Sequence, residues 1–129
     1  MDELTRRHQE PVALARAAAE AIRGLNHATR GRDGIGQPSA AYDILGALST
    51  AAARTGQALA QISRYLDTAA TAGRLGHDHG QDPALAVDAA AIFLSDAQHS
   101  AAALAGDLDA AQQQLALLNG RPRRRKDRP

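Results

Sequence analysis

Small and apolar residues recur at alternating spacings of three and four along two long stretches of this chain, from Ala41 to Ala69 and from Val87 to Leu118. This spacing keeps one stripe of side chains on a single side of an α-helix, as in helices that pack along a shared seam. Two such runs predict an antiparallel helical hairpin. They leave the chemistry open, because seam residues serve shape and not reactivity.

The expected seam consists of leucine layers separated by small residues. In the first run the seam positions are Ala41, Leu45, Leu48, Ala52, Thr55, Leu59, Ile62, Leu66 and Ala69. In the second run they are Val87, Ala90, Leu94, Ala97, Ala101, Leu104, Leu108, Ala111, Leu115 and Leu118. One antiparallel register pairs the layers as Leu66 with Val87, Leu59 with Leu94, Ala52 with Ala101 and Leu45 with Leu108. A waist of small residues then brings the helices close together; it consists of Ala52, Thr55, Gly56, Ala97 and Ala101.

Prolines, glycines and N-capping residues predict where the helices begin and end. A shorter first helix is expected over about 11–27, since proline suits the first helical position. The hairpin helices are expected over about 39–72, with Ser39 as N-cap, and about 83–119, with Asp82 as N-cap and Gly120 as C-terminal cap. The chain is therefore predicted to be an all-α three-helix bundle built on a long antiparallel hairpin.

The first helix is expected to cover the groove beside the waist. Its apolar side includes Val12, Ile22 and Leu25. A second stripe on the helix over 39–72 widens that helix enough to receive it; the stripe consists of Ile44, Ala51, Ala58 and Tyr65. The prediction is one domain over residues 1–120, followed by a disordered basic tail over 121–129.

The predicted core is thin, because alanine supplies most of the apolar residues and aromatic residues make up only 2% of the chain. Some apolar residues are left outside the seam or beyond its paired length: Leu85, Ile92, Phe93, Leu115, Leu117 and Leu118. Exposed apolar patches mark binding surfaces, and small domains gain stability by associating. These six residues are therefore predicted to bind a second copy or a partner helical protein. The alternative is that Leu4, Ile35 and Leu75 cover them.

The tail carries the concentrated charge of the chain. Its basic residues are Arg121, Arg123, Arg124, Arg125, Lys126 and Arg128. Against Asp127 they give the tail a charge of +5, which leaves about −4 for residues 1–120 of a total of +1. The open interpretations are a solvated tail, non-specific contact with nucleic acid phosphates or another anionic surface, and contact with an acidic protein.

His77 and His79 form the best metal-binding motif, in the glycine-flanked segment between the two long helices. Imidazole, with Asp78 and Asp82 nearby, suits zinc or nickel. The alternative is an ordinary solvated loop. No cysteine is present, and no other cofactor is indicated.

Catalytic motifs are weak, so the chain is expected not to be an enzyme. Ser95, Asp96 and His99 share one helix outside the expected seam, and no oxyanion donor accompanies them. The glycine-rich segment 31–36 follows a helix instead of a strand and lacks the Gly-Lys-Ser/Thr ending of a phosphate loop. No apolar run is long enough to span a membrane, and the first seven residues lack a signal peptide's apolar stretch, so the expected location is the cytoplasm.

The segments 41–48 (Ala-Tyr-Asp-Ile-Leu-Gly-Ala-Leu), 57–59 (Gln-Ala-Leu) and 65–66 (Tyr-Leu) resemble small alanine- and arginine-rich helical proteins of high-GC, actinobacterial type. That resemblance brings no functional site. In size and shape the chain is also similar to secreted helical-hairpin proteins with a Trp-x-Gly turn, although it has no tryptophan and its turn is Gly-Arg-Leu-Gly-His over 73–77.

The leading functional hypothesis is a non-enzymatic, self-associating interaction or scaffold protein whose tail contacts nucleic acid. The alternatives are a metal-binding or metal-sensing protein that uses His77 and His79, and a secreted hairpin that acts with a paired partner.

Overall fold

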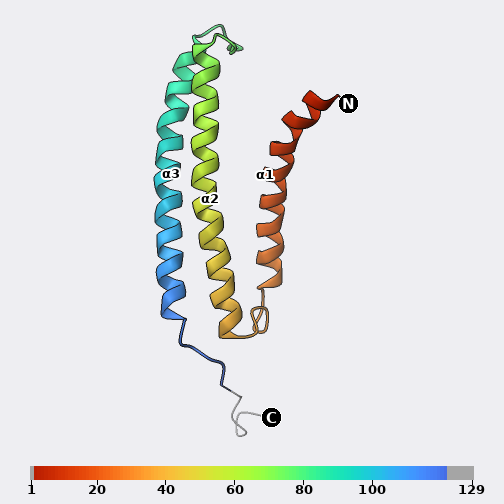
Figure 1. Ribbon diagram of the computed structural model, residues 1–129, viewed down its shortest axis with the longest axis vertical. Coiled ribbons are helices and arrows are strands. Elements are labelled where there is room, and N and C mark those ends of the chain that lie inside the picture. Colours follow the sequence, from red (N-terminus) through yellow and green to blue (C-terminus); the bar gives the residue numbers. More distant parts are fainter. Residues whose placement is uncertain (1, 122–129) are drawn as a thin grey trace.

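The computed structural model describes residues 2–121, which form three α-helices joined by loops. The helices are α1 (Glu3–Ala28), α2 (Pro38–Thr71) and α3 (Pro83–Gln114). Figure 1 shows α2 and α3 side by side and antiparallel along their length, with the loop over 72–82 joining them at one end. The predicted all-α fold built on a long antiparallel hairpin is confirmed. Most of the predicted basic tail lies outside the described residues.

The loop end of the hairpin is built by the capping residues that the sequence places there. Gly73 adopts a left-handed φ of 71°, which lets its N–H bond to the carbonyl of Ala70 and the N–H of Arg74 bond to that of Ala69. At the start of α3, the side chain of Asp82 accepts a hydrogen bond from Ala84 N at 3.0 Å, as predicted. At this loop, hydrogen bonds therefore satisfy backbone groups at the end of α2 and at the start of α3.

The other end of the hairpin differs from the expectation in both helices. Helix α2 begins at Pro38 with Gln37 as its N-cap, so Ser39 lies inside the helix and does not cap it. Helix α3 ends at Gln114, and a turn over 115–117 follows it. The predicted cap at Gly120 is wrong. Helix α3 ends level with the start of α2, because no facing helix continues beyond Pro38.

Helix α1 begins eight residues earlier than Pro11, the predicted start. The carboxylate of Asp2 accepts a hydrogen bond from Thr5 N at 2.8 Å and caps the helix. Pro11 consequently lies inside α1, where it lacks the N–H that would bond to the preceding turn. The start of α1 is therefore set by the capping residue Asp2 and not by Pro11.

The seam between α2 and α3 follows one seven-residue repeat. On α3 it runs through Ala84, Val87, Ala91, Leu94, Gln98, Ala101, Ala105, Leu108, Gln112 and Leu115, all half-buried. On α2 it runs through Leu45, Ser49, Ala52, Gly56, Leu59, Ser63, Leu66 and Ala70, all half-buried or buried. The predicted column containing Leu45, Ala52, Leu59 and Leu66 is therefore correct. In the alternate column Thr55 and Ile62 are exposed, and the seam instead shifts one residue further along, to Ser49, Gly56 and Ser63. Leu48, and Ala90 and Ala97 of α3, are half-buried at the border of the seam.

This shift has a steric cause. Ser49, Gly56 and Ser63 are smaller than Leu48, Thr55 and Ile62, so they let the two backbones approach more closely. A Cβ atom built on Gly56 would lie 3.7 Å from the Cβ of Ala101, which is ordinary van der Waals contact. The predicted close waist is thus present at Gly56 and Ala101, whereas Thr55 is exposed and bonds to its own helix.

Polar contacts between the helices fit the predicted register. The Ser49 hydroxyl lies 2.6 Å from Asp109 Oδ1 and 3.0 Å from the carbonyl oxygen of Ala105. Nearer the open end, Gln112 Nε2 donates to the carbonyl of Tyr42 at 3.1 Å. These contacts place residues near 45 opposite residues near 108, as the paired leucine layers require.

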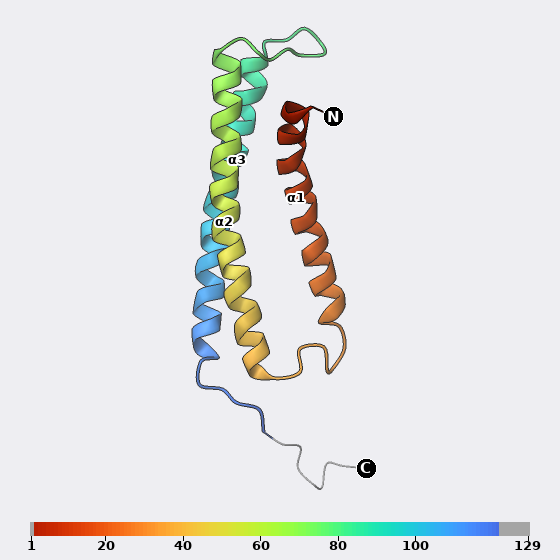
Figure 2. The ribbon, with the colours of Figure 1, turned by 45° about the vertical axis from the view of Figure 1, so that its right-hand side comes forward.

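Helix α1 stands apart from the hairpin. Figures 1 and 2 both show it as a separate column beside α2, joined to α2 by the loop over 29–37. Within the described part of the chain, no Cα atom of α1 lies within 8 Å of a Cα atom in α2 or α3. The expectation that Val12, Ile22 and Leu25 fill the groove of the hairpin is therefore wrong for this arrangement.

The resulting core is very small. Among residues 2–121, the only buried residues are Ser49, Ala52 and Ala69, with exposed fractions of 5%, 6% and 1%. No large side chain in that range is fully buried. No helix of the described chain is long and apolar enough to cross a membrane.

Candidate interaction surface

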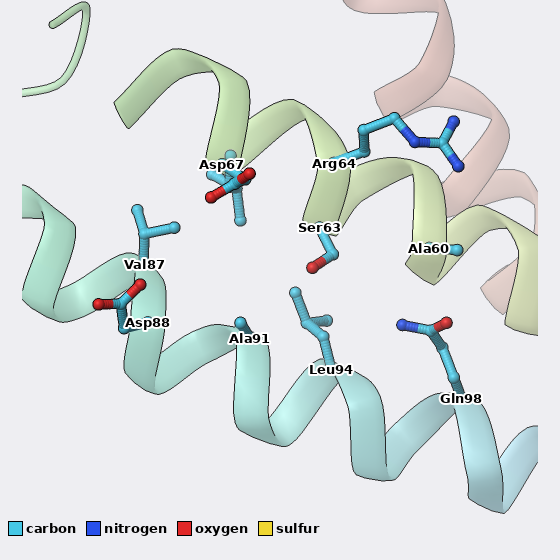
Figure 3. A pocket seen from close by; sticks show the side chains of 10 residues that line it. Ala60, Ser63, Arg64, Asp67, Val87, Asp88, Ala91, Leu94 and Gln98 are labelled. Atoms are coloured by element: carbon cyan, nitrogen blue, oxygen red, sulfur yellow. The ribbon is translucent and has the colours of Figure 1, made fainter. Parts of the chain in front are cut away.

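One side of the α2–α3 seam is polar. Figure 3 shows an open cavity there, of about 320 Å³, between the halves of α2 and α3 nearest their connecting loop. Ser63 and Leu94 point toward each other across it, and Asp67 and Asp88 lie at its loop end. The Ser49–Asp109 contact lies on the same side of the seam by helical position. This side is therefore where the two helices place their polar groups.

The opposite side of the seam is apolar. On α2 it carries Leu48 and Ile62, which immediately precede the small seam residues Ser49 and Ser63. On α3 the equivalent positions are Ala97 and Leu104, which precede Gln98 and Ala105. Because the helices are antiparallel, these preceding positions lie on the same side of the hairpin, away from the cavity. We call this surface the apolar face; it consists of Ile44, Leu48, Ala58, Ile62 and Tyr65 of α2 with Phe93, Ala97 and Leu104 of α3.

Five of the eight residues of the apolar face are exposed in the single chain, and Ile44, Leu48 and Ala97 are half-buried. Phe93 has an exposed fraction of 73%, Tyr65 of 61% and Leu104 of 51%. The face extends along α2 from Ile44 to Tyr65, about 32 Å at 1.5 Å per residue. Exposed apolar surface of this extent makes the face the candidate interaction surface of the described chain.

The six predicted partner-binding residues separate into four locations. Phe93 lies on the apolar face, whereas Leu85 and Ile92 lie on the outer side of α3, opposite the seam; all three are exposed. Leu117 and Leu118 are exposed beyond the end of α3. Leu115 is half-buried at the last seam position, so it packs in the hairpin and does not belong to a free patch.

From the sequence, all seven other residues of this face were assigned to buried contacts, either in the seam or beneath the first helix. Ile62 and Leu104 were predicted seam positions, and Tyr65 was predicted to lie beneath the first helix; all three are exposed. The sequence does contain a signal for the correct seam. Small residues recur at positions 49, 56 and 63, with the same spacing as the larger residues at 48, 55 and 62, so either set could face α3.

Helix α1 carries a second unpartnered apolar stripe. It consists of Leu4, Pro11, Ala15, Ala18, Ile22 and Leu25, spaced by seven and then alternately by four and three. Leu25 is half-buried and the other five are exposed. An amphipathic helix of this kind is stabilised by burying its stripe against another element.

The total exposed area measures how much surface lacks a partner. The chain exposes 10454 Å², whereas a compact monomer of 13.5 kDa exposes about 6,500 Å². The nine residues outside the described range add at most about 1,700 Å², the value for a fully unfolded segment of their mass. Most of the excess of about 4,000 Å² therefore belongs to the helices and loops.

The predicted metal motif brings two histidines together. The rings of His77 and His79 are 5.9 Å apart, and His77 Nδ1 accepts a hydrogen bond from His79 N at 3.1 Å. No cluster of three or more metal-ligating residues occurs in the part of the chain that the structure describes. His77 and His79 thus remain a two-residue motif, and metal binding there stays a prediction.

The other motifs are not drawn into one site. His99 Nδ1 lies 2.8 Å from the backbone carbonyl oxygen of Ser95, so this ring nitrogen contacts the backbone and not the serine hydroxyl. Gly31 and Gly36 adopt left-handed φ angles of 79° and 87° in the connection between α1 and α2. Arg121 is exposed, and the other basic residues of the tail lie outside the described range.

No protein-family model matches the chain, and comparison with curated proteins and with solved structures finds no match.

Proposed function

We propose that this protein is a non-enzymatic helical-hairpin interaction protein that self-associates through the apolar face of α2 and α3. The observation that carries the proposal is the contrast between this face and the core. Three small residues are buried in the described chain, while Ile62, Tyr65, Phe93 and Leu104 remain in contact with solvent. Burying apolar surface is the main stabilising contribution in folding and association, so association supplies what the single chain lacks.

The exposed area is sufficient for a stable interface. A standard interface buries about 800 Å² on each partner, and the excess exposed area of this chain is several times larger. Burial of the apolar face and of the α1 stripe would bring the exposed area toward that of a compact protein. Small domains with little core commonly obtain stability in this way.

Phe93 and Ile92 offer a matched pair of variants to test the surface. They are neighbours on α3 with similar exposure, but Phe93 lies on the apolar face and Ile92 on the outer side of the helix. We expect light scattering to show a dimer or larger species for the wild type at micromolar concentration. Phe93→Ser should shift it toward monomer by at least tenfold in dissociation constant, whereas Ile92→Ser should not.

Two results would contradict this proposal. A wild-type chain that is monomeric at several hundred micromolar does not self-associate at all. Loss of association in Ile92→Ser, with Phe93→Ser unaffected, would place the interface on the outer side of α3. Circular dichroism of both variants checks that the helices are retained.

We further propose that the basic tail contacts nucleic acid without sequence preference. The support is compositional: six of the nine residues over 121–129 are arginine or lysine, while residues 1–120 carry about −4. Each phosphate neutralised on duplex DNA contributes a slope of about −0.9 to the dependence of log affinity on log salt. Truncation after Gly120 should abolish salt-dependent binding to a duplex; retained binding would assign it to another surface.

A further inference from the structure

We infer that the occupant of the apolar face is α1 of a second copy of this chain, so that two copies exchange their first helices. This inference rests on the proposed self-association and specifies which surfaces meet. It joins the two unpartnered apolar surfaces of the molecule, the apolar face of the hairpin and the stripe of α1.

The two surfaces match in length. The α1 stripe spans 22 residues from Leu4 to Leu25, and the apolar face spans 22 residues of α2 from Ile44 to Tyr65, which is 21 residue-to-residue steps in each case. At 1.5 Å per residue, each is about 32 Å long. A helix placed along the face can therefore bury its stripe without leaving either surface partly uncovered.

The charges of the two elements also favour contact. Helix α3 carries four aspartates and no lysine or arginine, whereas α1 carries four arginines against three glutamates. Asp88 and Asp109 lie on the polar side of the seam, whereas Asp107 lies beside Leu104 at the edge of the apolar face by helical position. Opposite net charges steer association and exclude like-charged partners.

In the structure, α1 of the same chain stands away from the hairpin. A Cβ atom on Gly34 would lie 2.6 Å from the carbonyl oxygen of Arg30 and 2.8 Å from that of Thr29, so the loop is folded tightly back on the end of α1. Packed helices lie 8–10 Å apart between their axes, yet no Cα atom of α1 comes within 8 Å of one in α2 or α3. The face is therefore open to α1 of another chain.

Thiol cross-linking can test this pairing cleanly, because the chain contains no cysteine. One chain carries Ile22→Cys on the α1 stripe, and a second chain, marked by a mass tag, carries Ala58→Cys in the middle of the apolar face. The two are mixed, equilibrated and treated with a short bis-maleimide. We expect a covalent product that contains both chains, at least tenfold more abundant than with the matched control Gln57→Cys, which lies on the other side of α2.

The alternatives give different results. A double variant with both Ile22→Cys and Ala58→Cys that cross-links only within single chains would show that each α1 covers its own hairpin, and would overturn the exchange. A dimer by light scattering without cross-links between α1 and the face would overturn this inference and leave the proposed self-association intact. A monomer throughout would overturn both.

Discussion

The hydroxyl of Ser49 on α2 lies 2.6 Å from Oδ1 of Asp109 on α3, and Ser49 is one of three buried residues in the described chain. This contact joins the two helices on the polar side of their seam. It is also the shortest hydrogen bond between them, so it is the first place to test how the hairpin is held together.

Ser49→Ala should lower the free energy of unfolding by about 1 kcal/mol relative to Ser100→Ala, because a hydrogen bond of this kind contributes about that amount. Ser100 is exposed on α3, and its replacement gains the same helix propensity. Urea unfolding at one chain concentration measures both. In a double-mutant cycle with Asp109→Ala, a coupling energy near zero would show that the two side chains do not interact.

The close approach of the helices at Gly56 and Ala101 predicts opposite effects of two enlargements. Gly56→Ala should raise the free energy of unfolding by about 0.5–1 kcal/mol, because the new methyl group meets ordinary contact distance and a helical glycine is removed. Ala101→Leu should lower it by about 1–3 kcal/mol by overpacking the seam. Thermal unfolding checks both, and tolerance of leucine at 101 would mean that the seam is open there.

Replacing Gly46 by alanine should be less stabilising than replacing Gly106, which is also a glycine inside a helix. A Cβ atom on Gly46 would lie 2.5 Å from Gln112 Nε2, whereas one on Gly106 would meet nothing within 4 Å. Gly106→Ala should therefore gain about 1 kcal/mol from helix propensity. In Gly46→Ala that gain should be offset by about 1 kcal/mol, since Gln112 must leave the carbonyl of Tyr42. Equal stabilisation of the two variants in urea would contradict the Gln112 contact.

The start of α1 should respond to acid. The backbone N–H of Thr5, which donates to Asp2, holds the pKa of that carboxyl below its ordinary value of 3.8. Because the folded pKa is lowered, the stabilisation of the first turn is present above the unfolded pKa and is lost as pH falls through the folded pKa. Relative to the intrinsic exchange rate at each pH, amide exchange of residues 3–6 should therefore accelerate below about pH 4. Asp2→Asn, which keeps the cap without titrating there, should remove this acceleration.

The seam illustrates how far the sequence alone could lead. The leucines of one column, Leu45, Leu59 and Leu66, were correctly assigned to the seam. Leucines that recur every seven residues share one side of a helix, and burying that side is favourable. The second column was ambiguous, since 48, 55, 62 and 49, 56, 63 share the same period. Hydrophobicity favoured Leu48 and Ile62, but backbone approach favoured Ser49 and Ser63, and the structure follows the second requirement.

The interaction surface was predictable only in part for the same reason. Phe93 was identified because it lies clearly outside the seam, whereas Ile62 and Leu104 were assigned to the seam that they border. Helix α1 stands apart from the hairpin, and the loop that joins it to α2 folds back at Gly34 onto Thr29 and Arg30. Glycine spacing alone does not specify such a shape, and the expected packing of α1 against α2 was wrong.

The small size of the buried core bears on how long each copy of the protein survives. A fold with little core keeps a larger unfolded fraction when dilute, and proteases degrade that fraction. Under the proposed self-association, binding of a second copy would withdraw chains from this unfolded fraction, and more strongly at higher chain concentration. Chains synthesised rapidly would then be degraded more slowly than chains synthesised sparsely, so that cellular abundance rises more steeply than the rate of translation.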